Sequence, residues 1–522
     1  MEKEQDKYWL NTVLDTVEEK YPSGDILVSS GISPSASYHI GNFREIMSAD
    51  LIKVGLELRG RKVKHIHIVD NFDPLRKKYS FLPDEYENYV GWPVCLVPSL
   101  DKKYASYADQ FFDIFYQTVK ELKIDAEVIK SYEELYCTGR MTEQIEMAVD
   151  HVNEIKTIFK EVSNRELGDD YIPLQILSDK NKFNEWTYKS IDKNSKEVIA
   201  IDDDGNEHRA AYDKGQVKLP WRLDWPARWG VLGVMVEPHG FQEHGASGGS
   251  YQTGLRFAKE VFGIEGPIAG IQYGHIHLPG DNIKMSSSLN NLVTPDEALK
   301  IMPPAMLRYF YARYPGKKRV EFDPGMGFYR LMDEFSQVDV DAKAGNDNEF
   351  LSAYKIATAV TESTGMSTLP FSQIVNVYQA ALKNKEDALK ILERTCPDEA
   401  GSQKQAILNE FDFAKNWLEK WAPDEVKFDL KQELPNVEIS QLQKQMLGQL
   451  AQQIKESDGE KDGPWFHALI HEVREKNNLA PGEAFQAVYR VLLGKDSGPK
   501  AGWFLSILDK EFLINRFNEA SK

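Results

Sequence analysis

The first seventy residues alternate apolar and polar stretches in an order that predicts a strand, a helix and a second strand. The run "DILVSS" (25–30) is short and apolar, as in a buried strand, and Gly31 to Ser37 follow as a loop. From Gly41 to Leu58, apolar residues recur every three or four positions, which indicates an amphipathic helix. "VKHIHIVD" (63–70) predicts the second strand. This order predicts half of a nucleotide-binding parallel sheet.

Beyond this unit, the pattern predicts an insertion and further core strands. The chain becomes polar between Ile176 and Val217, where short alternating runs flank the turn "IDDDGNEH". We therefore expect a small β-rich insertion at about 165–220. The apolar runs at 219–240 and 266–278 predict two more core strands.

The last third of the chain has a different pattern. From about residue 336 helical periodicity dominates, and segments such as "STLPFS", "KWAPDE" and "GEKDGP" separate the helices. We therefore predict an α/β domain over residues 1–335, followed by an all-α domain over 336–522.

Composition narrows the class of protein. No apolar run reaches 18 residues, and the first twenty residues carry acids and lysines where a signal peptide would be apolar, so we expect a cytoplasmic protein outside the membrane. The formal charge of −18 argues against a protein that coats nucleic acid, so a polyanion would need a local basic patch. Cys95, Cys137 and Cys396 are widely spaced, which argues against a disulfide framework or a cysteine zinc site.

The stretch "HIGN" at the start of the predicted helix suggests a phosphate site. Helix N-termini present unpaired N–H groups to anions. His39 and Asn42 can each donate a hydrogen bond to phosphate, and Gly41 would let the phosphate approach. On these four letters alone, an alternative in which His39 only orders a loop stays open.

A second short motif favours the phosphate site over the interpretation in which His39 only orders a loop. "KMSSS" offers Lys284 and three hydroxyls, which suit the charge on a departing pyrophosphate. Together the two motifs resemble the HIGH and KMSKS signatures of class I aminoacyl-tRNA synthetases. Longer blocks, among them "HIVDNFDPLRK", "KLPWRLDWPARW", "GGSYQTG" and "LLGKDSGPKAGWFLSILD", are similar in order and wording to class I lysyl-tRNA synthetases. The resemblance spans nearly the whole chain and implies a Rossmann-like α/β catalytic domain with a parallel sheet, followed by the all-α domain.

The resemblance also implies site residues. His39, Asn42 and Lys284 would be catalytic, and a wider set would bind ATP. Other positions would line the lysine pocket, although Trp221 and Tyr273 could equally be core residues. The acid that receives the lysine ammonium is open among Asp70, Glu237 and Glu243. The implied ATP-binding residues are His39, Gly41, Asn42, Lys284, Met285, Ser286 and Ser287, and the implied lysine-binding residues are Gly31, Ser33, Trp221, His244 and Tyr273.

The implied reaction joins L-lysine to tRNA(Lys) through lysyl-adenylate, with ATP arriving as its Mg²⁺ complex. The all-α domain would bind the anticodon arm through a local basic cluster, and we expect a monomer, although the sequence does not specify the oligomeric state. No set of His, Asp or Glu matches a known ligand spacing, and the insertion has no cysteine, so we expect no structural zinc.

Departures from the family pattern keep two alternatives open. "FQEH" (241–244) stands where the family commonly has "GKDH", and Ser287 replaces the second lysine of KMSKS. A class I synthetase for another amino acid, or a paralogue that has lost aminoacylation, would also fit the short motifs, but the long blocks disfavour the former.

Overall fold

The computed structural model describes residues 8–241, 248–268, 271–280, 293–316 and 320–522. The chain forms two compact units, each assembled from segments that are separated in sequence. Because the units exchange segments, no single cut in the chain separates them, and a domain boundary at 335/336 stays a prediction. The first unit comprises Met1–Ala298, Leu307–Phe322 and Glu349–Glu362, and the second comprises Leu299–Met306, Asp323–Asn348 and Ser363–Lys522.

A parallel sheet organises the first unit. Strand β1 (Ile26–Ile32) pairs with β2 (Val63–Val69), and β2 pairs with β3 (Glu127–Lys130), all in parallel. On the other side of β1, the backbone N–H of Ser29 donates to the carbonyl of Val236, 2.8 Å away. The strand order therefore reverses at β1. Ligands of such sheets bind beyond the carboxyl ends of the strands at this point.

Two short strand pairs follow on this side of the sheet. β9 (His239–Gly240) runs parallel to β10 (Gln272–Tyr273), and β11 (Ile276–His277) runs parallel to β12 (Val320–Glu321). The apolar run at 266–278 thus contains extended chain, as predicted, but in two short pieces.

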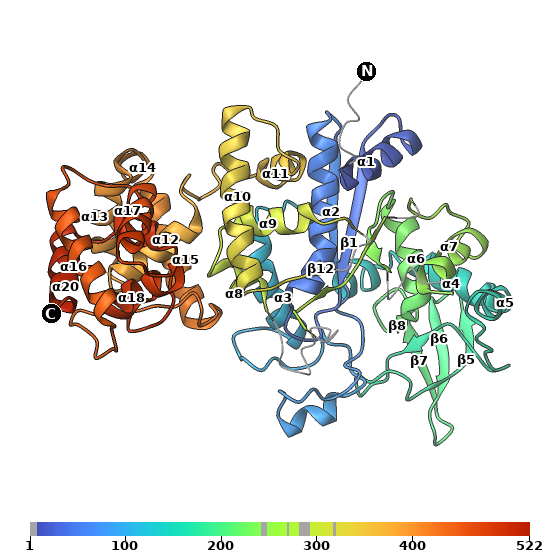
Figure 1. Ribbon diagram of the computed structural model, residues 1–522. Coiled ribbons are helices and arrows are strands. Elements are labelled where there is room, and N and C mark those ends of the chain that lie inside the picture. The colour runs from blue at the N-terminus through green and yellow to red at the C-terminus, as the bar shows by residue number, and fades with distance from the viewer. Residues whose placement is uncertain (1–7, 242–247, 269–270, 281–292, 317–319) are drawn as a thin grey trace. The chain divides into compact units, whose positions relative to one another are not determined.

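The crossover from β1 to β2 is helix α2 (Ile40–Leu58), which confirms the predicted strand, helix and strand. In Figure 1, α2 runs alongside β1. The helix is buried on more than its apolar face, because Asp50 forms an ion pair of 2.6 Å with the fully buried Arg308. Arg308 also donates to the backbone carbonyls of Leu122 and Ala357. These contacts hold helix α2 in place, and with it the helix N-terminus that follows the end of β1.

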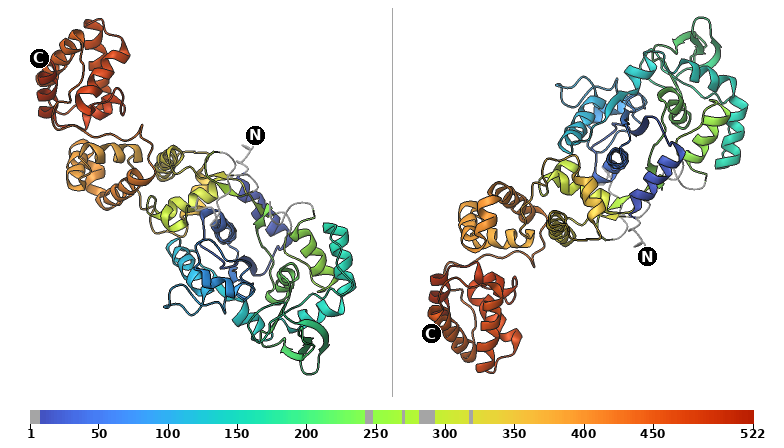
Figure 2. Two further views of the ribbon diagram at one scale, coloured as in Figure 1. Left: turned by 90° about the horizontal axis from the view of Figure 1, so that it is seen from below. Right: turned by 90° about the horizontal axis from the view of Figure 1, so that it is seen from above.

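The predicted β-rich insertion is an antiparallel sheet of three strands. They are β5 (Thr187–Asp192), β6 (Glu197–Ile201) and β7 (Glu207–Ala211), drawn in green in Figure 2. Residues before and after them pair as β4 (Gln175–Ile176) and β8 (Val217–Lys218), which closes the insertion at its base. The insertion therefore returns the chain close to where it left the unit's core.

The prediction of a core strand across 219–240 is wrong for its first half. Trp221–Leu232 form helix α6, and only the segment around Val236 and β9 is extended. Every residue from Leu223 to Trp229 is buried. A helix buried on all sides shows no apolar stripe, and a short continuous apolar run does not distinguish it from a strand.

The second unit is helical, and residues 322–522, all of them described, contain no strand. Trp417 is fully buried there, with its ring stacked on Tyr329 at 5.0 Å and its indole N–H donating to the carbonyl of Pro324. The helices are α10 (Met326–Ala344), α12 (Phe371–Ala380), α13 (Lys385–Thr395), α14 (Pro397–Ser402), α15 (Lys404–Lys420), α16 (Gln441–Glu456), α17 (Gly463–Lys476), α18 (Pro481–Leu493), α19 (Ala501–Ser506) and α20 (Lys510–Ala520).

The remaining helices belong to the first unit, except for the last residue of α8 and the first three residues of α9. No helix in the described ranges is both long and apolar enough to cross a membrane. The helices are α1 (Trp9–Lys20), the 3₁₀-helix η1 (Asp84–Tyr89), α3 (Tyr107–Glu121), the π-helix η2 (Ser131–Tyr136), α4 (Thr142–Asp150), α5 (Val152–Ser163), α7 (Ser250–Glu260), α8 (Pro295–Leu299), α9 (Pro304–Arg313) and α11 (Leu351–Thr358).

Candidate active site

A pocket of about 880 Å³ opens at the carboxyl ends of β1 and β9, where the strand order reverses. Loops after these strands, the N-terminus of α2 and the start of α6 form its wall. The pocket brings together residues that are up to 245 positions apart, since it is lined by both Gly31 and Ile276. The sequence-predicted residues that line it are Gly31, Ser33, His39, Gly41, Asn42, Trp221 and Tyr273.

The other predicted site residues lie outside the described part of the chain. They are His244, which belongs to the "FQEH" departure, and the four residues of the KMSSS motif, namely Lys284, Met285, Ser286 and Ser287. Their assignments stay predictions from the sequence.

His39 and Asn42 cap the N-terminus of α2 reciprocally. The His39 Nδ1 accepts the backbone N–H of Asn42 at 3.2 Å, and the Asn42 side-chain oxygen accepts the backbone N–H of His39 at 3.4 Å. A ring nitrogen that accepts a hydrogen bond carries no proton, so a neutral His39 has its proton on Nε2. His39 therefore orders the loop and also lines the pocket, which combines the two interpretations of "HIGN".

Gly41 is required by this cap. A Cβ atom at position 41 would lie 2.7 Å from the Nδ1 of His39 and 2.8 Å from its Cε1. The absence of a side chain thus admits the imidazole ring as well as opening the helix terminus to an anion.

Glu45, which the sequence analysis missed, connects two predicted lysine-pocket residues. Its Oε1 accepts the backbone N–H of Gly31 at 2.7 Å, and its Oε2 accepts the hydroxyl of Tyr273 at 2.7 Å. Glu45 also lines the pocket. Its position three residues after Asn42, on the same side of the helix start, was a usable signal.

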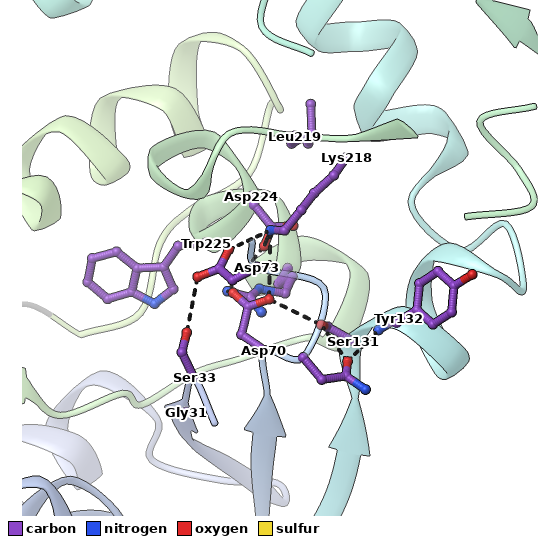
Figure 3. Close-up of polar contacts among 12 residues, drawn as sticks. Gly31, Ser33, Asp70, Asp73, Ser131, Tyr132, Lys218, Leu219, Asp224 and Trp225 are labelled. Atoms are coloured by element: carbon purple, nitrogen blue, oxygen red, sulfur yellow. Dashed lines mark hydrogen bonds and ion pairs between the residues drawn. The ribbon is translucent and has the colours of Figure 1, made fainter. Parts of the chain in front are cut away.

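A buried ion cluster lies beside Ser33. The ammonium of Lys218 lies 3.1 Å from Asp224, 3.4 Å from Asp73 and 3.7 Å from Asp70. Figure 3 shows these contacts, together with the Ser33 hydroxyl that donates to Asp73 at 3.1 Å. The cluster therefore connects the base of the insertion to the loop after β1.

Burial and charge oppose each other in this cluster. Burial alone would lower the pKa of the Lys218 ammonium, but the surrounding carboxylates raise it above its ordinary value. Burial would raise the pKa of Asp70, whereas Lys218 and Arg228 hold it below its usual range. For Asp73, burial and repulsion from Asp70 raise the pKa. Arg228 lies 3.2 Å from Asp70, so two cations face three carboxylates.

Glu237 lies on the aromatic side of the pocket. It accepts the indole N–H groups of Trp225 and Trp229, and burial raises its pKa. The ring of Trp221 stacks on that of Trp225 at 5.5 Å, and both line the pocket. Glu237 is therefore held by indoles.

The three acids predicted to receive the lysine ammonium differ in what holds them. Asp70 is committed to Lys218 and Arg228, Glu237 is held by two indoles, and Glu243 lies outside the described residues. Glu45 was absent from that set.

Two cations at the rim were also missed. Arg76 and Lys77, together with Tyr79, line the pocket from the segment after β2. The letters "RKKY" after a predicted strand end were the available signal. Within the described ranges, no three His, Cys, Asp or Glu residues are grouped as a metal site.

Two sequence comparisons with known proteins point to the same family. The family described as tRNA synthetases class I (K) matches residues 7–362. The lysine–tRNA ligase of Methanosarcina barkeri (strain Fusaro) is 36% identical over 535 residues, covering 98% of each chain. That of Archaeoglobus fulgidus is 34% identical over 494 residues, covering 94% of this chain and 96% of the relative. A crystal structure of a glutamate tRNA ligase from Elizabethkingia meningosepticum covers 95% of this chain and 99% of its own, at 12% identity and a TM-score of 0.42.

The family match covers the whole pocket and its supporting sheet, and the relatives extend through the helical unit. The chain therefore belongs to the class I tRNA synthetases of the lysine type.

Proposed function

We propose that this protein is a lysine–tRNA ligase that activates L-lysine with ATP and transfers it to the 3′ end of tRNA(Lys). The observation that carries the proposal is the pocket itself. It joins a helix N-terminus capped by His39 and Asn42, suited to phosphate, to the Gly31, Glu45 and Tyr273 contacts, suited to an amino acid with a cationic side chain.

In the first step, the lysine carboxylate attacks the α-phosphorus of ATP, and the bond to pyrophosphate breaks. The nucleophile belongs to the substrate, so the protein contributes positioning and charge stabilisation. The Nε2–H of His39, the side-chain amide of Asn42 and the backbone N–H of Gly41 would hold phosphate oxygens. Lys284, on the motif outside the described residues, would stabilise the departing pyrophosphate with Ser286 and Ser287.

The lysine side chain would be recognised by Glu45. Its carboxylate is aimed by hydrogen bonds from Gly31 and Tyr273, and would accept the ε-ammonium. The indole of Trp221 offers a face for the same cation or for its methylene stem. Ser33, held by Asp73, would face the α-amino or carboxylate end.

ATP would bring Mg²⁺ as part of the substrate. Asp70 and Asp73 are engaged by Lys218 and Arg228, and Mg²⁺ bound to phosphates keeps several waters and needs few protein ligands. We propose no structural zinc.

In the second step, a ribose hydroxyl of the tRNA 3′ end attacks the carbonyl of lysyl-adenylate, and AMP leaves. The helical residues 336–522 would hold the anticodon arm. We also propose that the protein acts as a monomer in the cytoplasm, where its substrates are made.

The discriminating test is ATP–pyrophosphate exchange with each of the twenty amino acids, with and without tRNA. Exchange with lysine alone supports the proposal. Exchange with another amino acid would point to a different class I synthetase. The absence of exchange under every condition would point to a paralogue without this activity.

A further inference from the structure

A short segment at the mouth of the pocket carries cations and aromatic rings that the steps above do not use. Arg76, Lys77 and Tyr79 line the pocket, and Phe81, two residues further on, is 41% exposed. We propose that this rim segment, residues 76–81, binds the unpaired 3′-terminal nucleotides of the tRNA and guides them into the pocket. The inference rests on the proposed function, because it requires a tRNA substrate.

The two aromatic rings form a platform suited to bases. The rings of Tyr79 and Phe81 are stacked, with centroids 5.6 Å apart and planes only 10° apart. Unpaired nucleotides bind on such rings without regard to sequence, because every base has a π-face. A pair of parallel rings, of which Phe81 is exposed and Tyr79 half-buried, therefore suits single-stranded RNA.

The position of the platform favours a chain of nucleotides over a single one. Tyr79 lines the pocket and Phe81 does not, so the pair leads from the surface to the pocket wall. A mononucleotide held at the start of α2 would use at most the inner ring. A strand whose last residue enters the pocket would pass over both.

The two cations are available for phosphates. The nearest carboxylate to Arg76 is Asp73, at a long 3.7 Å, and the Arg76 side chain is 71% exposed. Lys77 has no carboxylate partner in the described ranges, and its ammonium lies 5.6 Å from the centroid of the Tyr79 ring. Lys78, by contrast, is paired with Asp84.

Charge elsewhere makes this rim distinctive. The chain carries a formal charge of −18, and the pocket wall also presents Glu45, Asp70 and Glu237. A polyanion approaching such a surface is repelled except where cations gather. Two exposed cations beside an aromatic pair are the local patch that an acidic tRNA-binding protein needs.

The test compares an intact tRNA(Lys) transcript with one that lacks its three 3′-terminal nucleotides. For the wild-type protein, we expect the truncated transcript to bind about tenfold more weakly, in keeping with the loss of stacked bases. Tyr79→Leu should weaken binding of the intact transcript by about tenfold and leave the truncated one within twofold. Tyr79→Phe, which keeps the ring, should retain the difference.

Lys103→Ala provides a matched control. Lys103 lies over the ring of Tyr104 at 4.8 Å, as Lys77 does over Tyr79, but neither Lys103 nor Tyr104 lines the pocket. Lys77→Ala should therefore reduce affinity for the intact transcript, whereas Lys103→Ala should not.

Three outcomes would overturn the inference. These are equal weakening of both transcripts by Tyr79→Leu, no weakening of either, or a raised KM for ATP with tRNA affinity unchanged, which would assign the rim to ATP. If Tyr79→Leu does not fold, Phe81→Leu gives the same comparison, since it keeps apolar volume and removes the outer ring. A wild-type protein that cannot charge the intact transcript with lysine would instead overturn the proposed function, before any variant is made.

Discussion

The hydroxyl of Tyr273 donates to one oxygen of Glu45 at 2.7 Å, while the other oxygen of that carboxylate accepts the N–H of Gly31. A helix, the end of β1 and the end of β10 therefore meet at a single carboxylate. Its charge is aimed by fixed partners before any substrate arrives, which reduces the ordering needed on binding.

Glu45→Gln should raise the KM for lysine by about 10- to 100-fold, because a charge-assisted hydrogen bond is replaced by a neutral one. The amide oxygen can still accept from Gly31, so the fold should persist. ATP–pyrophosphate exchange at varied lysine measures the effect, with the KM for ATP as internal control. An unchanged KM for lysine would remove Glu45 from the recognition of the ammonium.

Gly41→Ala should lower the rate of adenylate formation by about 10²-fold. The new Cβ would stand 2.7 Å from the His39 ring, and displacements of this size misalign reacting groups. The decisive measurement is a double-mutant cycle. In a His39→Ala background, adding Gly41→Ala should cost less than about twofold, because no ring is left to displace. Equal costs in both backgrounds would mean that Gly41 acts in another way.

Lys284→Ala should slow adenylate formation by about 10²-fold or more, in line with the loss of one donor that stabilises developing charge. Rapid-quench measurement of the first turnover isolates this step. Lys259→Ala, an exposed lysine on α7 that does not line the pocket, is the control. A normal first-turnover rate for Lys284→Ala would exclude that role.

Lys218→Met should destabilise the protein by about 3–5 kcal/mol, because it leaves buried carboxylates facing one another with Arg228 as the remaining cation. Adding Asp224→Asn should recover part of the lost stability, since it removes one of the buried negative charges that Lys218 had neutralised. Urea unfolding followed by tryptophan fluorescence gives both values. No recovery in the double variant would contradict an electrostatic cause.

Acid should destabilise the protein through two buried histidines of strand β2. The Ser30 hydroxyl contacts His65 Nε2 and His67 Nδ1, each at 2.8 Å, and the ring of His67 stacks on Phe115. Burial lowers the pKa of His67 to about 3 and holds that of His65 well below its usual range. Since the unfolded chain binds these protons first, stability present above about pH 6.5 is lost as the pH falls toward 3.

At pH 5, His67 alone should account for roughly 2 kcal/mol of this loss. Urea unfolding at pH 7.5 and pH 5 should therefore show a smaller difference for His67→Phe than for the wild type. The same difference in both proteins would place the acid sensitivity elsewhere.

The strand, helix and strand of the first seventy residues could be predicted because α2 and the flanking strands carry regular apolar spacing. Helix α6 could not, because a helix buried from Leu223 to Trp229 has no polar face to reveal its period. Short motifs identified His39 and Gly41, yet not their mutual packing, which depends on the cap geometry. Glu45 was missed for a similar reason: its partners Gly31 and Tyr273 lie 14 and 228 positions away.

The position of Lys218 has a consequence for engineering. It is the last residue of β8, at the base of the insertion, and its ammonium neutralises aspartates from the loop after β2 and from α6. A shortened enzyme that joins β4 directly to α6 would lack that cation. The buried aspartates near Ser33 would then lose a partner for their negative charge. Any shortened version of the insertion must therefore keep its two base strands together with the parallel sheet.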